Sequence, residues 1–283
     1  MSLVNAIDLI READRKRAAV FSFVCIDYNE VRAVIDAAER AGKPAIVMLL
    51  PEYVTNFRLN DFEEFAAMVK PMAARASAPI ALHLDHSYDE AEVRRAIDAG
   101  FTSVMFDASR DDLETNIRRT RAIVEYAHGR GVAVESELGS VGLARERAEA
   151  QKDLFTKPDA AAYFCRETGV DSLAIAIGNA HGDYLQTPRL DLARLDAIDA
   201  ATDTPLVLHG GSGIPENQLA EAFGRGINKF NYGTDIKRRY IAAIREYMSA
   251  HEPPESLDVL GLPAAVQGAM AELVEHKLRL SRM

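Results

Sequence analysis

Three of the seven histidines follow short apolar segments that have the character of buried strands. His86 comes after "IALHLD", His181 after "LAIAIGNA" and His209 after "PLVL". Imidazole nitrogens are common zinc ligands, and a catalytic zinc keeps three protein ligands and one open position. If the three segments end at one place, the sequence predicts a catalytic zinc or cobalt site. The alternative is that each histidine only forms hydrogen bonds in the core.

Carboxylates lie beside these histidines in the chain. Asp85 directly precedes His86 and is a candidate general acid/base whose pKa a metal would tune. Glu137 is a candidate ligand or a partner of a ligand. Asp107 ends another apolar segment and fits a structural cap equally well. His83 shares a strand face with Asp85, so it either orients that carboxylate or has a structural role, which we favour.

Two glycine-containing segments have the composition of phosphate-binding loops. "HGGSG" holds Gly210, Gly211 and Ser212, and "NYGTD" holds Gly233 and Thr234. Each follows a predicted strand and leads into a predicted helix, where backbone N–H groups bind phosphate. A tight turn with a helix cap would use the same residues. Two such segments on neighbouring strands favour phosphate.

The alternation of apolar segments with helical patterns predicts the element that positions these residues. Most segments are continuously apolar, as in parallel strands covered on both faces. A single (β/α)8 TIM barrel over residues 1–283, with extra N- and C-terminal helices near residues 3–17 and 263–280, fits best; an open doubly wound sheet is the alternative. The predicted strands cover residues 20–26, 45–50, 80–85, 103–107, 133–138, 173–177, 206–209 and 229–232. Residues 87–90 are expected to open the helix after the third strand.

The overall composition and charge limit the classes of molecule that the protein is expected to bind. The net charge is −10, which disfavours nucleic acid and anionic lipid as partners. Cys25 and Cys165 are too few for a disulfide framework and are expected to be reduced core residues. The sequence shows neither a signal peptide nor a long apolar run, so we expect a cytoplasmic protein that does not bind membranes.

Five motifs together resemble the class II ketose-bisphosphate aldolases, the family of fructose- and tagatose-bisphosphate aldolases. They are "LHLDH", "VESELGSVG", "SLAIAIGNAHGDY", "LVLHGGSGIPE" and "INKFNYGTD", in the family's order over nearly the whole chain. The resemblance implies a zinc-dependent aldolase that forms dihydroxyacetone phosphate and an aldehyde through a metal-stabilised enediolate. It also implies a homodimer or homotetramer.

The resemblance further implies a role for individual residues. His86, His181 and His209 would bind Zn²⁺, with Glu137 near the metal, and Asp85 would act on the C4 hydroxyl. Asn231 would contact the enediolate. The phosphate of dihydroxyacetone phosphate, with Na⁺ or K⁺ nearby, would lie against Gly182, Gly210, Gly211, Ser212, Gly233 and Thr234. The long segment 139–157 resembles a lid. Its Glu146, or Glu149, could protonate C3; a plain solvated helix is the alternative.

Three departures from the family pattern concern the other half of the substrate. Val24 stands where the family has a substrate-contacting Asn, the segment "MLLPEYV" is apolar, and residues 252–255 ("EPPE") lack the family's arginine. We therefore expect a ketose 1-phosphate whose aldehyde half need not carry phosphate. The alternatives are a bisphosphate aldolase that uses Arg58, Arg110 or Arg145 for the far phosphate, and a non-catalytic partner subunit.

Overall fold

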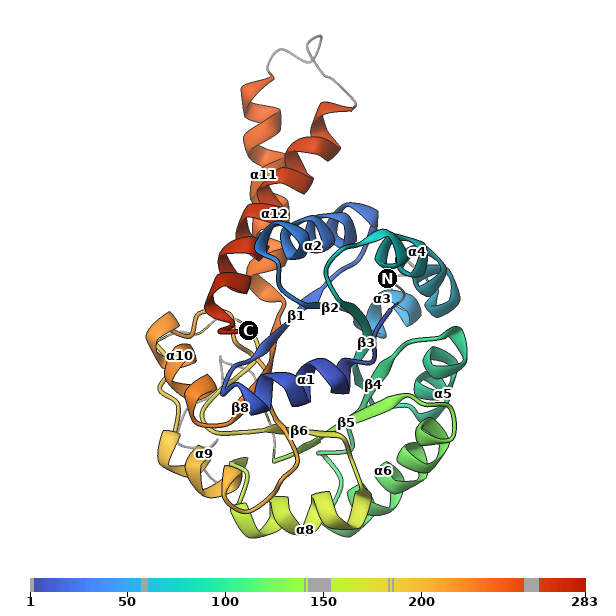
Figure 1. Ribbon diagram of the computed structural model, residues 1–283, viewed down its shortest axis with the longest axis vertical. Helices are drawn as coiled ribbons and strands as arrows, with labels where there is room; N and C mark the ends of the chain where they lie inside the picture. Colours follow the sequence, from blue (N-terminus) through green and yellow to red (C-terminus); the bar gives the residue numbers. More distant parts are fainter. Residues whose placement is uncertain are drawn as a thin grey trace.

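The predicted barrel is confirmed by the computed structural model, which describes residues 3–56, 61–139, 141, 154–182, 184, 186–251 and 260–283. Parallel strands pair in chain order, and β1 pairs with β8 to close the barrel (Figure 1). The strands are β1 (Val20–Val24), β2 (Ala45–Leu49), β3 (Ile80–Ser87), β4 (Ser103–Phe106), β5 (Ala133–Leu138), β6 (Ser172–Ile175), β7 (Leu206–Leu208) and β8 (Ile227–Tyr232).

Helices surround this barrel, and α11 and α12 extend together well beyond it (Figure 1). The expected terminal helices are present as α1 and α12. The helices are α1 (Ala6–Arg15), α2 (Tyr28–Ala41), α3 (Glu52–Thr55), α4 (Phe62–Arg75), α5 (Glu90–Ala99), α6 (Leu113–His128), α8 (Pro158–Thr168), α9 (Leu192–Asp199), α10 (Glu216–Gly224), α11 (Thr234–Ala250) and α12 (Gly261–Leu280).

Local sequence explains where helices begin and end. Asp27 caps α2 by accepting a hydrogen bond from the backbone N–H of Asn29 at 2.8 Å, and Asp89 caps α5 in the same way. The same two helices end at Gly42 and Gly100, whose φ angles of 61° and 94° favour glycine. Start and stop signals therefore set the helix lengths that return the chain to the next strand.

The N-terminal end of the barrel is closed by α1. Its buried residues pack against residues at or near the first positions of four strands, in a cluster of Ala6, Ile7, Leu9, Ile10, Val20, Ile46, Ala81 and Ala133. Burying this much apolar surface stabilises the closure by the hydrophobic effect. The opposite end, where the strands finish, is left for the polar residues.

Strand bounds differ from the sequence-based expectation by at most two residues. Unlike the other strands, β3 extends beyond its expected end, to Ser87, with a shift in register between Leu84 and Ser87. His86 within this irregular stretch has a φ of 38°, in the left-handed region. Residues 87–90 therefore do not simply open α5, because Ser87 still belongs to the sheet. The bulge changes the direction of the His86 side chain relative to a regular strand.

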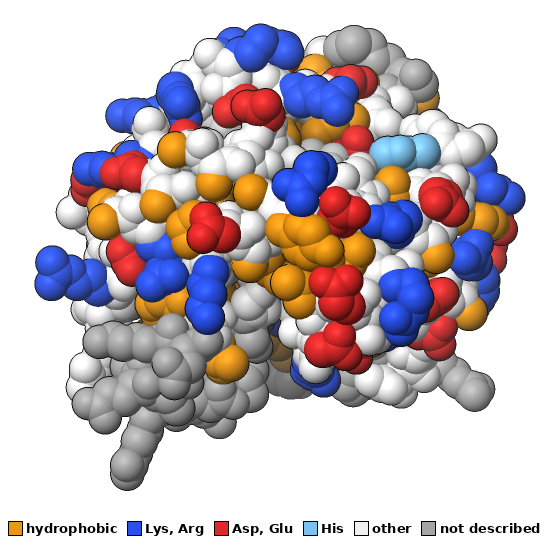
Figure 2. All heavy atoms as spheres, turned by 90° about the horizontal axis from the view of Figure 1, so that it is seen from below, with side chains coloured by type: hydrophobic (Ala, Val, Ile, Leu, Met, Phe, Trp, Pro, Cys, Tyr) orange, Lys and Arg blue, Asp and Glu red, His pale blue; other side chains and the backbone are white. Residues whose placement is uncertain are grey.

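Both cysteines are free and buried, as expected for reduced core residues. Within the described ranges, no helix combines the length and hydrophobicity needed to cross a bilayer. Figure 2 shows the face on the side of α6 and α8 (placed by Figure 1), where basic and acidic side chains are interspersed around small apolar areas. Neither the basic nor the acidic side chains form a separate patch on this face.

Candidate metal centre and active site

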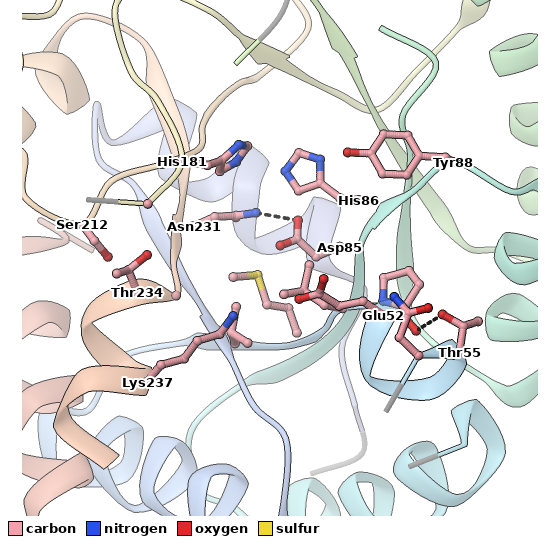
Figure 3. Close-up of a pocket in the computed structure, with 18 of the residues that line it drawn as sticks. Glu52, Thr55, Asp85, His86, Tyr88, His181, Ser212, Asn231, Thr234 and Lys237 are labelled. Atoms are coloured by element: carbon pink, nitrogen blue, oxygen red, sulfur yellow. Dashed lines mark hydrogen bonds between the residues drawn. The ribbon is translucent and has the colours of Figure 1, made fainter. Parts of the chain in front are cut away.

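His86, His181 and His209 converge at the C-terminal end of the barrel. Figure 3 shows the first two, with their rings close together beside Asp85. Each offers a ring nitrogen, and these nitrogens all lie within 4.8 Å of one another. The ring centroid of His86 is 4.8 Å from that of His181 and 4.5 Å from that of His209. The prediction that the three segments end at one place is confirmed.

Two carboxylates fix the orientation of two of these rings. Nδ1 of His86 lies 3.1 Å from Oδ2 of Asp107, and Nε2 of His209 lies 2.8 Å from Oε1 of Glu135. Burial opposes ionisation of Asp107, but the hydrogen bond from His86 outweighs it and lowers the pKa of Asp107 to about 2. Burial is likewise outweighed at Glu135, where Lys229 and His209 lower the pKa. Both carboxylates are therefore ionised acceptors, and both facing ring nitrogens carry hydrogen.

The remaining nitrogens of the two rings face each other. Nε2 of His86 lies 2.7 Å from Nδ1 of His209. Two lone pairs at that distance repel, so the pair must share either a proton or a cation. Without a metal it holds a proton, because Asp85 and the hydrogen bond to Asp107 overcome burial and raise the pKa of His86 to about 9. This donor set fits a divalent metal, which both imidazoles could bind once that proton is released.

His181 and Glu137 complete the centre. Burial, with the neighbouring charges of His86 and His209, lowers the pKa of His181 to about 3, so its imidazole is neutral and able to bind metal. Burial and the nearby Asp107 raise the pKa of Glu137 to about 8. Oε2 of Glu137 is buried without a hydrogen-bond partner. His86, Asp107 and Glu137 also form a second group of possible ligands.

Asp85 lies beside this centre and is 4% exposed. Nδ2 of Asn231 donates a hydrogen bond to Oδ1 of Asp85 at 2.9 Å, which fixes the carboxylate (Figure 3). Burial opposes ionisation, but the charges of His86, His209 and Lys229 lower the pKa of Asp85. Asp85 is therefore an ionised base at neutral pH.

His83 does not orient Asp85. Its Nδ1 bonds Oγ of Ser103 at 2.7 Å, and its Nε2 faces Nζ of Lys229 at 3.5 Å. Burial and Lys229 lower the pKa of His83 to about 3. The favoured structural role therefore fits these contacts.

All the predicted phosphate-loop residues line one cavity of about 630 Å³, which also contains Asp85, His86 and His181. The cavity-lining loop residues are Gly182, Gly210, Gly211, Ser212, Gly233 and Thr234. A Cβ on Gly210 would lie 2.1 Å from the carbonyl oxygen of Ala180, and one on Gly211 would overlap the Phe230 ring. These two positions therefore require glycine. Oγ of Ser212 accepts a hydrogen bond from the N–H of Asp235 at 3.2 Å.

Three structural contributions were missed by the sequence analysis. Tyr184 donates a hydrogen bond to the carbonyl oxygen of Gly210 at 2.9 Å and accepts one from the N–H of Ala180 at 2.7 Å. Glu135 supports His209, and Lys237 lines the cavity. In "VESEL" two glutamates alternate with uncharged residues of a predicted strand, so Glu135 could have been recognised as a buried carboxylate. Tyr184 and Lys237 resemble ordinary loop and helix residues in the sequence.

Glu146, Glu149, Arg58 and Arg145 lie outside the described residues, as do residues 252–255 and most of the expected lid. Arg110 lies over the ring of Tyr88, with its Cζ 4.7 Å from the ring centroid, and is not among the described residues that line the cavity.

Comparisons with known proteins agree on one family. The family model described as "Fructose-bisphosphate aldolase class-II" matches residues 4–283. A fructose-bisphosphate aldolase from Geobacillus stearothermophilus is 37% identical over 251 residues, which is 88% of this chain and 87% of the relative.

Solved structures give the same result. The YdjI aldolase from Escherichia coli K12 aligns with a TM-score of 0.87 and 34% identity, covering 99% of this chain and 97% of its own. A putative fructose-1,6-bisphosphate aldolase from Coccidioides immitis aligns with a TM-score of 0.87 and 29% identity, over 98% and 96% of the two chains.

Proposed function

Because this chain belongs to the class II fructose-bisphosphate aldolase family, and is thus a lyase, we propose that it reversibly cleaves a ketose 1-phosphate into dihydroxyacetone phosphate and an aldehyde. The observation that carries the proposal is the 2.7 Å approach of Nε2 of His86 to Nδ1 of His209, beside an ionised Asp85. The family is generally metal-dependent, and these facing nitrogens, with the neutral ring of His181 beside them, form a donor set that suits a metal cation.

We propose zinc as that cation, held by His86, His181 and His209 with Glu137 close by. Three neutral imidazoles and an open position are typical of catalytic zinc sites. When bound, the metal supplies a Lewis acid that stabilises the negative charge of the enediolate. The hydrogen bonds from His86 to Asp107 and from His209 to Glu135 orient the rings for this role.

Asp85 and Asn231 would act on the substrate itself. Asp85, ionised and buried, takes the proton of the C4 hydroxyl as the C3–C4 bond breaks. Asn231 holds Asp85 through its Nδ2, while its Oδ1 is buried without a partner and can accept a hydrogen bond from a substrate hydroxyl. Glu146 remains our candidate for protonating C3, although it lies outside the described residues.

The C1 phosphate would bind at the loops after β6, β7 and β8. Gly233 provides no side-chain cap for the first turn of α11. The N–H of Asp235 donates to Oγ of Ser212, but the other N–H groups at the start of the helix could bind an anion. Hydroxyls of Ser212 and Thr234 face the same end of the cavity (Figure 3). A nearby Na⁺ or K⁺ stays a prediction from the family resemblance, and so does the cytoplasmic location.

A bisphosphate aldolase is the second candidate, because the Geobacillus stearothermophilus relative carries the name fructose-bisphosphate aldolase. A non-catalytic partner subunit is disfavoured by the retention of Asp85, three histidines and both phosphate loops. These residues would have no common purpose in a purely supporting chain.

Metal analysis followed by an aldol-addition assay tests the proposal. Purified protein should hold about one zinc ion per chain, and it should condense dihydroxyacetone phosphate with at least one aldehyde of a panel. Chelation should abolish the reaction and zinc should restore it. Zinc-loaded protein with no turnover in either direction would contradict the proposal, and equal rates with fructose 1,6-bisphosphate and every ketose 1-phosphate would favour the second candidate.

We also propose a homodimer or homotetramer. The projecting pair of α11 and α12 exposes apolar side chains, with Ile241 48%, Met248 42% and Leu260 80% exposed. Light scattering after size-exclusion chromatography should give a mass of at least twice the 31.1 kDa of one chain. A monomer at micromolar concentration would contradict this expectation.

A further inference from the structure

Lys237 contributes a positive charge to the cavity that the proposed reaction does not yet use. It lies on α11, three residues after Thr234, and Figure 3 shows its amino group directed into the cavity. Nζ lies 5.2 Å from the centroid of the Tyr53 ring. Among the described residues, no carboxylate forms an ion pair with Lys237. The ammonium group is therefore available to a ligand.

The position of this ammonium differs from that of the phosphate loops. Ser212 and Thr234 follow β7 and β8, whereas Tyr53 belongs to α3, which follows β2. In Figure 3 the amino group of Lys237 points toward the middle of the cavity, on the side of Glu52, with the two hydroxyls on the other side. It therefore lies toward the part of the cavity that remains when the C1 phosphate occupies the loops.

The surroundings make this charge distinctive. Lys237 is the one lysine or arginine among the described residues that line the cavity. Val24, Met48 and Leu50 form an apolar wall beside it. The acidic lining residues are Glu52, Asp85, Asp89 and Glu92. Asp85 accepts a hydrogen bond from Asn231 at 2.9 Å, Asp89 one from the N–H of Ala91 at 2.7 Å and Glu92 one from the hydroxyl of Ser87 at 3.0 Å. Glu52 is exposed to solvent at the rim.

We propose that Lys237 is a specificity-determining residue that binds an anionic group, a carboxylate or a phosphate, at the far end of the aldehyde half. The inference rests on the proposed ketose 1-phosphate cleavage. A lysine ammonium is a flexible point charge that pairs with either anion. A cavity of about 630 Å³ has room for a chain between the reacting carbon and this charge.

Condensation kinetics with dihydroxyacetone phosphate test this assignment. Three aldehydes of equal chain length would be compared: one neutral, one ending in a carboxylate and one ending in a phosphate. We expect the zinc-loaded wild type to prefer an anionic aldehyde. Lys237→Gln should raise the KM of that aldehyde at least tenfold and change the KM of the neutral aldehyde less than twofold. The anion whose KM changes more is the natural one, and Lys237→Arg should retain the preference.

Lys16→Gln is the matched control, because Lys16 follows α1 at the closed end of the barrel and pairs with Glu12. This variant should keep wild-type constants. Unchanged constants in Lys237→Gln would overturn the inference, and so would an equal rise in KM for all aldehydes and for dihydroxyacetone phosphate, which would place Lys237 on the C1 phosphate. If the wild type condenses no aldehyde, the proposed function fails and the inference falls with it.

Discussion

At the scale of single residues, the candidate metal centre depends on the residues that form hydrogen bonds to the histidines as much as on the histidines themselves. Glu135 is 2% exposed and accepts hydrogen bonds from both His209 and Lys229, at 2.8 and 3.1 Å. Lys229 is fully buried, so its charge requires this carboxylate. The same carboxylate therefore neutralises a buried cation and determines which nitrogen of His209 is free for a metal.

Asp85→Asn should remove turnover while leaving the metal in place. The amide is nearly the same size and can still contact Asn231, but it cannot accept the C4 proton. We expect kcat to fall by about 10²–10⁴-fold, the usual contribution of a positioned base. Zinc content and kcat are the measurements, with Asp98→Asn on the surface as the control. Turnover within a few-fold of wild type would remove Asp85 from its role.

Glu135→Gln should weaken metal binding. The amide is uncharged, so its oxygen is a weaker acceptor for His209 and Lys229, and it leaves Lys229 without its counter-charge. We expect the metal Kd to rise about 10–100-fold, as when the support of a ligating histidine is lost. Competition with a chelator measures the Kd. The double variant Glu135→Gln with Lys229→Met removes the unpaired charge, so it should regain folding stability while metal binding stays weak. An unchanged Kd in the folded double variant would contradict this role.

At the scale of elements, the loops after β6 and β7 behave as one unit. The Tyr184 hydroxyl joins the backbone of Ala180 to that of Gly210, and Gly210, at a φ of 64°, packs directly on Ala180. His181 and His209 are each adjacent to this contact. This contact between the two loops therefore determines how His181 lies relative to His209 and to the proposed phosphate loops.

Tyr184→Phe should weaken the contact between the loops after β6 and β7 while the protein still binds its metal. Loss of a hydroxyl that leaves its partners unsatisfied costs about 1–3 kcal/mol. If about half of that cost falls on substrate binding, the KM of the ketose 1-phosphate rises about 2- to 12-fold. Steady-state kinetics measure this, with Tyr163→Phe as the control, because this half-buried tyrosine of α8 bonds Glu114 and does not line the cavity. A KM equal to that of wild type would show that the loops keep their arrangement without the hydroxyl.

The elements also show what could be predicted from the sequence. Continuous apolar segments and glycine stops gave the eight strands and the terminal helices, because burial and capping are local properties. The irregular end of β3 was not predictable, because the left-handed conformation of His86 depends on the surrounding strands. Lys237 looked like any helix-surface lysine, since only the barrel closure directs it into the cavity. Roles assigned to site residues stay predictions until tested.

At the scale of the whole molecule, buried carboxyls link stability to pH. Glu30 is 2% exposed at the start of α2, and burial, opposed by the N–H of Ile26, raises its pKa from 4.5 to about 7. Because the folded-state pKa is the higher one, its stabilising contribution is complete below pH 4.5 and is lost as the pH rises through 7. Each pKa unit corresponds to about 1.4 kcal/mol.

Glu30→Gln should therefore flatten the pH profile of stability. Relative to wild type, the variant should gain up to about 3 kcal/mol between pH 4.5 and 8, because its side chain never has to lose a proton in a buried position. Urea denaturation of zinc-loaded protein at a series of pH values measures the difference. Glu64→Gln, on an exposed position of α4, should parallel the wild type. Parallel profiles for Glu30→Gln and wild type would show that Glu30 titrates normally.

The closure of the barrel by α1 has a consequence for the length of the substrate. Because α1 covers one end of the barrel, a ligand can reach the cavity only from the other end. Asp85 and Asn231 are buried, whereas Glu52 and Lys237 are exposed. Under the proposed function, the far end of the aldehyde half would therefore lie nearest the opening. A longer aldehyde would extend outward from the reacting carbon, so the closed end of the barrel would not limit its length.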